Sequence, residues 1–240
     1  MFFRNLFKRK ETPFEMLKRV KPELFDTSGK TYNGGIFVDS PDSYHFLENE
    51  IELFPDANSV FLNVTDFEHS HLLPLCAFEL RLIDSSWKGK GYFIYYYKSQ
   101  SESISAESLV SEYGDYHVSV FNLTGDKISF AGDKSCFQHS VDELVYWDSV
   151  RNDYLKNATK AKDNLKTYLK DRKITIDQII RQARSHPMWI QSDETPIPIT
   201  NEEIYFVGQL EVNSLINEDE WIYLFYSPQK RILIQVEQWT

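Results

Sequence analysis

Apolar residues recur at steps of three and four in the middle of the chain, which is the period of an α-helix with one buried face. Ser140 and Glu143 form a capping-box pattern just before this stretch, and the period continues to about Lys170. We therefore expect one amphipathic helix that packs its apolar stripe on a sheet and leaves its lysines outside. The expected stripe consists of Leu144, Trp147, Val150, Tyr154, Ala158, Ala161, Leu165 and Tyr168.

Two shorter helices are predicted by their first residues. Thr175 and Gln178 form a second capping box, and we expect that helix to end at about Arg184, shortly before Pro187. Near the start of the chain, Thr12–Val20 carries an N-cap residue, a proline at the first helical position and a glutamate three residues after the cap. Helices therefore occupy the beginning and the middle of the sequence.

The remaining apolar segments are short and rich in β-branched and aromatic residues, which is typical of strands. The segment 76–83 alternates polar and apolar residues and should be half-buried, whereas 91–99 is apolar on both faces and should be central. Three further single strands are expected at 32–39, 59–67 and 204–212. Two hairpins are also expected: 116–123 with 127–132, which turns at 124–127, and 221–227 with 231–239, which turns at 227–230.

These elements predict an α+β fold that is rich in strands and has two antiparallel sheet units joined by a helical block. The pair 59–67 and 91–99 resembles the pair 204–212 and 221–227, as after a diverged duplication, although unrelated buried strands also look alike. We expect one compact domain over residues 1–240. Its expected parts are an N-terminal helix (1–31), a first sheet unit (32–135), a helical block (136–186) and a second sheet unit (187–240).

The charges of the chain are unevenly distributed. Basic residues exceed acidic ones by five in 1–21 and by six in 151–184, whereas acidic residues exceed basic ones by 14 in 22–150 and by seven in 185–240. Either the surface is a solvated acidic one with one basic helix, or the basic helix forms a face that binds an acidic partner. Nucleic acid is disfavoured, because most of the molecule would repel phosphates.

The sequence indicates a cytoplasmic protein with no membrane span. No apolar run approaches the roughly 18 residues that a spanning helix needs, and the N-terminal residues lack the apolar run and cleavage site of a secretory signal. The chain has only two cysteines, Cys76 and Cys136, which we interpret as reduced thiols.

Candidate catalytic groups are sparse. The chain has neither a P-loop nor a G-x-G-x-x-G motif. If 66–71 were a strand, His69 and His71 would share a face beside Asp66 and Glu68, but a third metal ligand has no recognisable spacing. A thiol at Cys136 beside His139 would need an activated pKa. We therefore expect no catalytic residue, metal or cofactor.

The candidate binding residues lie between Ala183 and Leu210. His186, Trp189 and Gln191 follow the end of the predicted helix, and Gln209 lies on the next strand. A buried glutamine must satisfy one acceptor and two donors, so these glutamines either hold irregular backbone or recognise a ligand against the Trp189 ring.

At this stretch the chain resembles the YwqG-like family of bacterial proteins of unknown function. The matching segments are Gly34–Gly35, 61–66, 91–97, 186–191, 206–209 and 221–226. The chain departs from the family pattern at Asn63, where a glutamine is expected, and at His186, which replaces a glycine. The resemblance implies a duplicated β-rich fold in a cytoplasmic bacterial protein and implies no activity.

Three functions agree with these observations. The first is a non-catalytic binding or interaction protein, such as an immunity-type protein that binds a basic protein. The second is a small-ligand binder that uses Trp189, Gln191 and Gln209. The third is a hydrolase or metal enzyme built on residues 66–71. The sequence leaves the oligomeric state and the role of the basic helix at 151–184 open.

Overall fold

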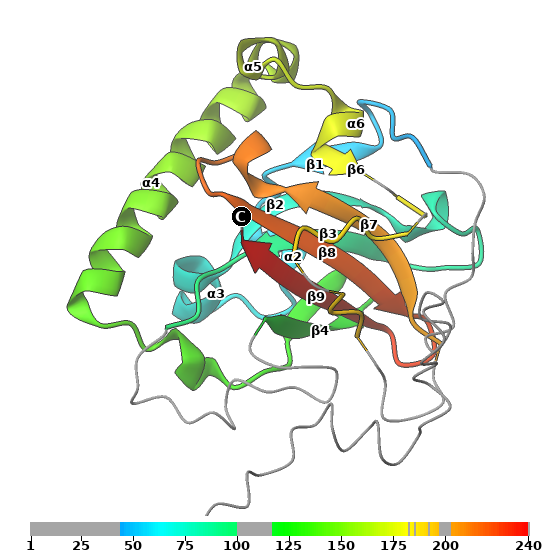
Figure 1. The fold of residues 1–240 in the computed structure, drawn as a ribbon, viewed down its shortest axis with the longest axis horizontal. Helices are drawn as coiled ribbons and strands as arrows, with labels where there is room; N and C mark the ends of the chain where they lie inside the picture. The colour runs from blue at the N-terminus through cyan, green and yellow to red at the C-terminus, as the bar shows by residue number, and fades with distance from the viewer. Residues whose placement is uncertain are drawn as a thin grey trace, which may run out of the picture.

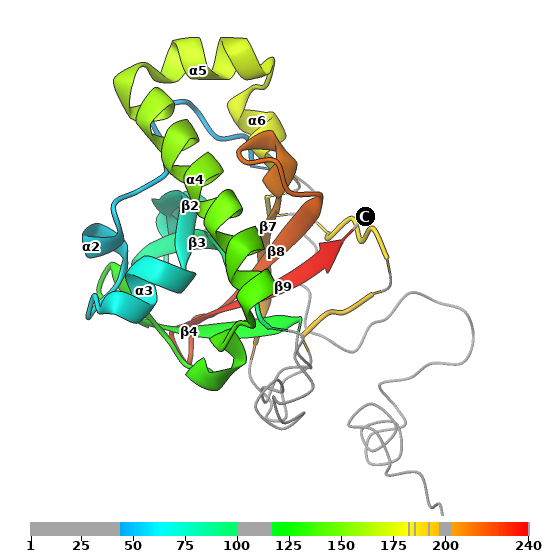
Figure 2. The same ribbon diagram turned by 90° about the vertical axis from the view of Figure 1, so that its left-hand side faces the viewer.

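The structure, a computed structural model, describes residues 44–99, 117–181, 183–184, 186–191, 193–196 and 203–239. The helix predicted at 12–20 and the strand predicted at 32–39 lie outside these residues. Two antiparallel sheets lie one behind the other, and a long helix runs along one side of them (Figures 1 and 2). The fold is therefore α+β, as predicted. None of the helices in these ranges is long and apolar enough to cross a membrane.

The smaller sheet has three strands in the order β1 (Ile51–Leu53), β2 (Leu73–Glu79) and β3 (Lys90–Tyr95). Strand β2 begins three residues earlier than predicted, and it is buried on both faces rather than half-buried. Strand β3 was expected to be central, but it lies at the edge of this sheet. Its side chains are nevertheless buried, because the larger sheet and a helix cover it.

The prediction of a strand at 59–67 is wrong. That segment contains the end of helix α2 (Ala57–Val60) and the beginning of helix α3 (Asp66–His71). The Asp56 carboxylate accepts a hydrogen bond from the Asn58 N–H at 2.8 Å, and Thr65 and Glu68 form a capping box at the start of α3. These side-chain caps satisfy the first N–H groups of the two helices and so prevail over the β-propensity of the apolar residues.

The larger sheet has six strands. In order they are β5 (Lys127–Phe130), β4 (Val118–Thr124), β9 (Ile232–Trp239), β8 (Glu220–Ser227), β7 (Tyr205–Glu211) and β6 (Ile180–Arg181). The two predicted hairpins, β4–β5 and β8–β9, are confirmed. Gly125 has a φ of 62° in the two-residue turn between β4 and β5, a conformation that glycine adopts without strain.

The two sheets do not follow the predicted units. Strands β4 and β5 were expected in the first unit, but β4 pairs with β9. The free edge of β3 is bonded by a side chain of the larger sheet: the Gln235 amide both accepts from the Ile94 N–H and donates to the Ile94 carbonyl. Residues 118–130 therefore extend the sheet formed by the C-terminal strands.

The helical block consists of α4 (Val141–Asp163), α5 (Leu165–Arg172) and α6 (Ile176–Ile179). The capping boxes at Ser140 and Thr175 are confirmed. The single predicted helix to about Lys170 is broken at Asn164, whose φ of −158° is extended and whose side chain accepts from the Thr167 N–H. Helix α6 ends earlier than predicted, because the chain enters β6 at Ile180.

Aromatic side chains attach the helical block to α3, to β2 and to the connection between β7 and β8. The Trp147 indole donates to the Ser70 carbonyl at 2.6 Å, the Tyr154 hydroxyl to the Pro74 carbonyl at 3.1 Å, and the Tyr168 hydroxyl to the Leu215 carbonyl at 3.0 Å. The predicted burial of the stripe is wrong at Leu144, which is exposed, and only partly correct at Leu165, which is half-buried. At about 100° per residue, Leu144 lies about 90° from the centre of the buried face.

A repeated unit is visible in the two sheets. The run β1–β2–η2–β3 and the run β6–β7–η5–β8 have the same order, where η2 (Leu80–Leu82) and η5 (Val212–Ser214) are short 3-10 helices. The register of the second strand shifts just after its start in both runs, between Pro74 and Cys76 and between Phe206 and Gly208. These shared irregularities agree with the predicted relation between the units.

A residue with a left-handed backbone follows each first strand, directly after β1 and three residues after β6. Phe54 and Arg184 both have a left-handed backbone, with φ of 51° and 63°. The Phe54 N–H donates to the Leu75 carbonyl, and the Arg184 N–H donates to the Val207 carbonyl, each next to the register shift. Counted back from the 3-10 helices, Ala77 corresponds to Gln209. The equivalence expected from the sequence, which placed Asn63 at the glutamine position, is therefore wrong.

Candidate functional site

The predicted binding segment 186–191 lies on the outer face of the six-stranded sheet. The Gln209 side-chain oxygen accepts from the Met188 N–H at 2.7 Å, and the Tyr223 hydroxyl donates to the Met188 carbonyl at 3.0 Å. The Gln238 side chain accepts from the N–H groups of Ile190 and Gln191 at 3.2 Å. Polar side chains of β7, β8 and β9 thus hold an irregular backbone, as one of the two interpretations predicted.

The four predicted residues do not form one site. Trp189 is half-buried, with its ring 4.3 Å from that of Tyr223 between centroids. Gln209 is buried on the same face of the sheet. Gln191 is exposed and donates instead to the Trp239 carbonyl at 2.6 Å, and His186 is exposed. The ligand-binding role of this region stays a prediction, and the described contacts give these side chains a structural role.

Trp189→Ala is expected to lower the free energy of unfolding by about 1–3 kcal/mol, because it removes a half-buried ring from the second core cluster. Chemical denaturation measures this change. Met188→Ala is the matched control, since the Met188 side chain is mostly exposed and its loss should cost less than about 0.5 kcal/mol. Equal effects of the two substitutions would contradict the packing role of Trp189.

The predicted cluster at 66–71 is not a metal site in this structure. Because the segment is helix α3, His69 and His71 are two residues apart on a helix and do not share a face. Glu68 is buried and forms a salt bridge with Lys134 at 3.0 Å, and His71 stacks on the Phe67 ring. Within the described ranges, no three His, Cys, Asp or Glu side chains are placed to hold a metal ion.

The two cysteines are free thiols and both are buried. Burial raises the pKa of the Cys136 thiol to about 11, and its Sγ donates to the Asp133 carbonyl at 2.9 Å. Burial also raises the pKa of Cys76. A nucleophilic cysteine requires a lowered pKa, so the arrangement at Cys136 disfavours that chemistry.

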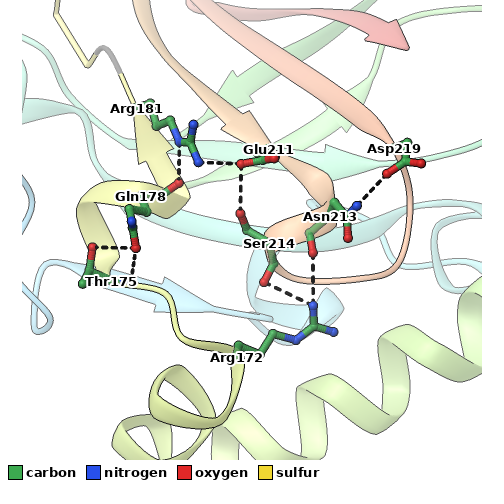
Figure 3. A network of polar contacts seen from close by, with 8 residues as sticks. All are labelled: Arg172, Thr175, Gln178, Arg181, Glu211, Asn213, Ser214 and Asp219. Carbon is green, nitrogen blue, oxygen red and sulfur yellow. Dashed lines mark hydrogen bonds and ion pairs between the residues drawn. The ribbon is translucent and has the colours of Figure 1, made fainter. Parts of the chain in front are cut away.

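A network of polar contacts joins the helical block to β7 and the loop that follows it (Figure 3). The Arg172 guanidinium donates to the carbonyls of Asn213 and Ser214, and Arg181 forms an ion pair with Glu211 at 2.5 Å. These two arginines of the basic segment 151–184 therefore bond to other parts of the same chain. The exposed cations that remain on α4 and α5 are Lys156, Lys160, Lys162, Lys166 and Lys170.

The outward face of α4 carries apolar side chains that the sequence did not single out as a surface. Val141, Val145 and Leu155 are 77%, 69% and 55% exposed, and Leu144 is 45% exposed. Val141 and Val145 are about one turn apart on the side of α4 that is turned away from Trp147, and Leu155 lies further along this outer side. We call Val141, Leu144, Val145 and Leu155 the outer stripe. Its sequence signal is the pair Val141 and Val145, which are four residues apart and lie off the predicted buried stripe.

Exposed carboxylates lie beside the N-terminal half of the outer stripe. Asp142 and Asp148 are exposed on the same turns of α4. The loop before β8 contacts another side of the helix, where the Tyr146 hydroxyl donates to Glu218 at 2.5 Å and the Asn217 N–H donates to Asp153 at 3.1 Å. An apolar stripe with an acidic rim is thus present at this end of the helix, while the exposed lysines begin at its other end.

No family model, curated protein or solved structure matches the chain. The resemblance to the YwqG-like family therefore stays a prediction.

Proposed function

We propose that this protein is a non-catalytic binding protein whose partner is a basic protein, and that the partner binds at the outer stripe of α4. The observation that carries the proposal is the exposure of Val141 and Val145, since clustered apolar side chains inside a polar rim are typical of protein-binding surfaces. An immunity-type protein, which neutralises a basic toxin, is one form of this function. The proposed site of action is the cytoplasm.

Charge supports a basic partner at this surface. Asp142 and Asp148 are exposed on the turns of α4 that carry Val141 and Val145, and the chain as a whole has a net charge of −10. A positively charged partner would be drawn to this end of α4 and repelled from the lysines at the other end, so charge also sets its orientation. The apolar stripe would provide the contacts that exclude water.

Polar substitutions in the outer stripe should weaken binding of the partner. The tagged full-length chain is used to capture proteins from its native lysate at low and high salt, and the eluted proteins are identified by mass spectrometry. We expect one dominant basic protein that high salt releases. For the Val141→Ser/Val145→Ser variant, the affinity for that purified protein should fall about tenfold or more, which corresponds to about 1.4 kcal/mol.

Leu62→Ser is the matched control, because Leu62 is also an exposed apolar residue but lies between α2 and α3. This variant should bind as the wild type does. Capture of an acidic protein, capture that persists at high salt, or equal affinity of the Val141→Ser/Val145→Ser variant and the wild type would each contradict the proposal. An empty column would contradict it as well.

A further inference from the structure

A cluster of polar side chains is buried between the two sheets, on the face of β8 and β9 that is turned toward β3. Glu220, Gln235 and Glu237 are each 4% exposed or less. Glu237 pairs with Ile222, so Glu220, two residues earlier on β8, is its diagonal neighbour on the same face. Two carboxyl groups therefore lie close together in the interior.

Gln235 joins this cluster to the smaller sheet. Its amide oxygen accepts from the Ile94 N–H at 2.9 Å, and its amide nitrogen donates to the Ile94 carbonyl at 2.6 Å. The same nitrogen also donates to the Glu237 carboxyl at 3.1 Å. The edge of β3 is thus bonded to β9 through the Gln235 side chain. Because Gln235 is also bonded to the Glu237 carboxyl, the protonation state of Glu237 acts directly on this side chain.

Tyrosine hydroxyls complete the cluster. The Tyr95 hydroxyl lies beside Glu218 and Glu220 and acts to lower the pKa of both carboxyl groups, and the Tyr146 hydroxyl donates to Glu218 from α4. The hydroxyls of Tyr96 and Ser119 are buried close to Glu237, although neither forms a well-aligned hydrogen bond with a described residue. Carboxyl groups and hydroxyls thus connect β3, β4, β8, β9 and α4.

Few charges oppose the carboxyl groups. Lys98, which follows β3, is the cation whose charge favours ionisation of Glu237, and the Cys136 thiol is also close. Around Glu220 the charged groups are Glu237 and Glu218, and around Glu218 they are Asp153 and Asp219. Ionisation of both Glu220 and Glu237 would place like charges side by side away from water.

We propose that the protonated carboxyl cluster of Glu220 and Glu237 locks β3 to β8 and β9, and that alkaline pH opens this contact between the two sheets. The lock is a pH-sensitive device of the fold and does not depend on the partner proposed above. Ionised carboxylates would draw water into the contact, and the bond between Gln235 and Ile94 would be lost with it.

The sign of the effect follows from the pKa shifts. Burial raises the pKa of Glu237 to about 8, and burial together with the charge of Glu237 raises the pKa of Glu220 well above its usual range. An unfolded glutamate has a pKa of about 4.3. Because the folded pKa is the higher one, the stabilisation is complete below about pH 4.3 and is lost as the pH rises through the folded pKa.

Hydrogen exchange at the Ile94 amide tests the lock, because this N–H is bonded to Gln235 rather than to a strand. Exchange of the full chain is followed from about pH 6 to about pH 9, corrected for the intrinsic rate. In the wild type, we expect the protection of Ile94 to fall about tenfold or more, while the amides between β8 and β9 keep theirs.

Glu237→Gln and Glu220→Gln are the test variants, because each removes one proton-dependent charge and keeps an oxygen acceptor. In either variant the protection of Ile94 should depend less on pH than in the wild type, so one folded variant is sufficient. Glu52→Gln is the control, since Glu52 is an exposed glutamate on β1. It should behave as the wild type does.

Three results would overturn the proposal. The first is constant protection of Ile94 in the wild type across this pH range. The second is a wild-type pH dependence that persists in the glutamine variants. The third is a parallel loss of protection between β8 and β9, which would show that the whole fold opens and not the contact between the sheets.

Discussion

Trp147→Ala is expected to lower the free energy of unfolding by about 3–5 kcal/mol, which is the usual cost of removing a large aromatic side chain from a core. The Trp147 side chain is 2% exposed, its ring stacks on Tyr95 with centroids 6.0 Å apart, and its indole N–H bonds to the Ser70 carbonyl. The substitution removes the contact with Tyr95 on β3 and the hydrogen bond to Ser70 in α3 at the same time. Urea denaturation at constant pH measures the loss.

Leu144→Ala is the control on the same helix. The sequence pattern placed Leu144 in the buried stripe, but its exposure predicts a change within about 0.5 kcal/mol. A loss of several kcal/mol for Leu144→Ala, or a negligible loss for Trp147→Ala, would show that α4 packs through a different face.

Gln235→Leu is expected to cost about 2–5 kcal/mol. The leucine fills a similar volume but leaves the Ile94 N–H and carbonyl without their partner, and each buried group without a hydrogen bond costs about 1–3 kcal/mol. The same denaturation experiment measures this loss, below pH 7 so that the carboxyl cluster stays protonated.

Gln191→Leu provides the comparison for Gln235→Leu. Gln191 is exposed and makes one side-chain bond to the Trp239 carbonyl, and water can replace that bond. Its substitution should cost no more than about 1 kcal/mol. If both substitutions had the same small effect, the bond between the two sheets would not contribute to stability.

Local signals in the sequence predicted the elements that local interactions determine. The capping boxes at Ser140 and Thr175 bond within one turn, and the hairpin at Gly125 needs only its own two strands. The strand predicted at 59–67 failed for a related reason, since its apolar residues favour a strand while Asp56 and Thr65 cap helices on either side. The competing helix-capping signal is therefore present in the sequence itself.

The positions of strands in the sheets were not predictable in this way. Strand β3 is apolar on both faces, which indicates burial but not whether a strand or a side chain covers its edge. The same limit applies to Gln235 and Glu237. They alternate with Ile234 and Val236, a pattern that ordinarily places polar residues in water, but here both faces of β9 are covered.

Residue type alone predicts only part of the contacts around the candidate binding residues. One of the two roles considered for the glutamines, the bonding of irregular backbone, describes the contact of Gln209, which accepts from the Met188 N–H. The sequence did not reveal Tyr223 and Gln238, which bond to the same segment from strands that are distant in sequence. The outer stripe of α4 is not predicted by the helical period, because that period indicates one buried apolar face and Val141 and Val145 lie outside it.

The order of strands in the larger sheet also has a consequence for biosynthesis. Strand β9 is the last strand in the sequence, yet it lies between β4 and β8 inside the sheet. While the chain emerges from the ribosome, β4 and β5 form a hairpin that exposes one long edge until residues 232–239 are made. Exposed strand edges promote aggregation, so a nascent chain that stalls before Ile232 should need chaperone protection more than one that stalls after the hairpin β8–β9 is complete.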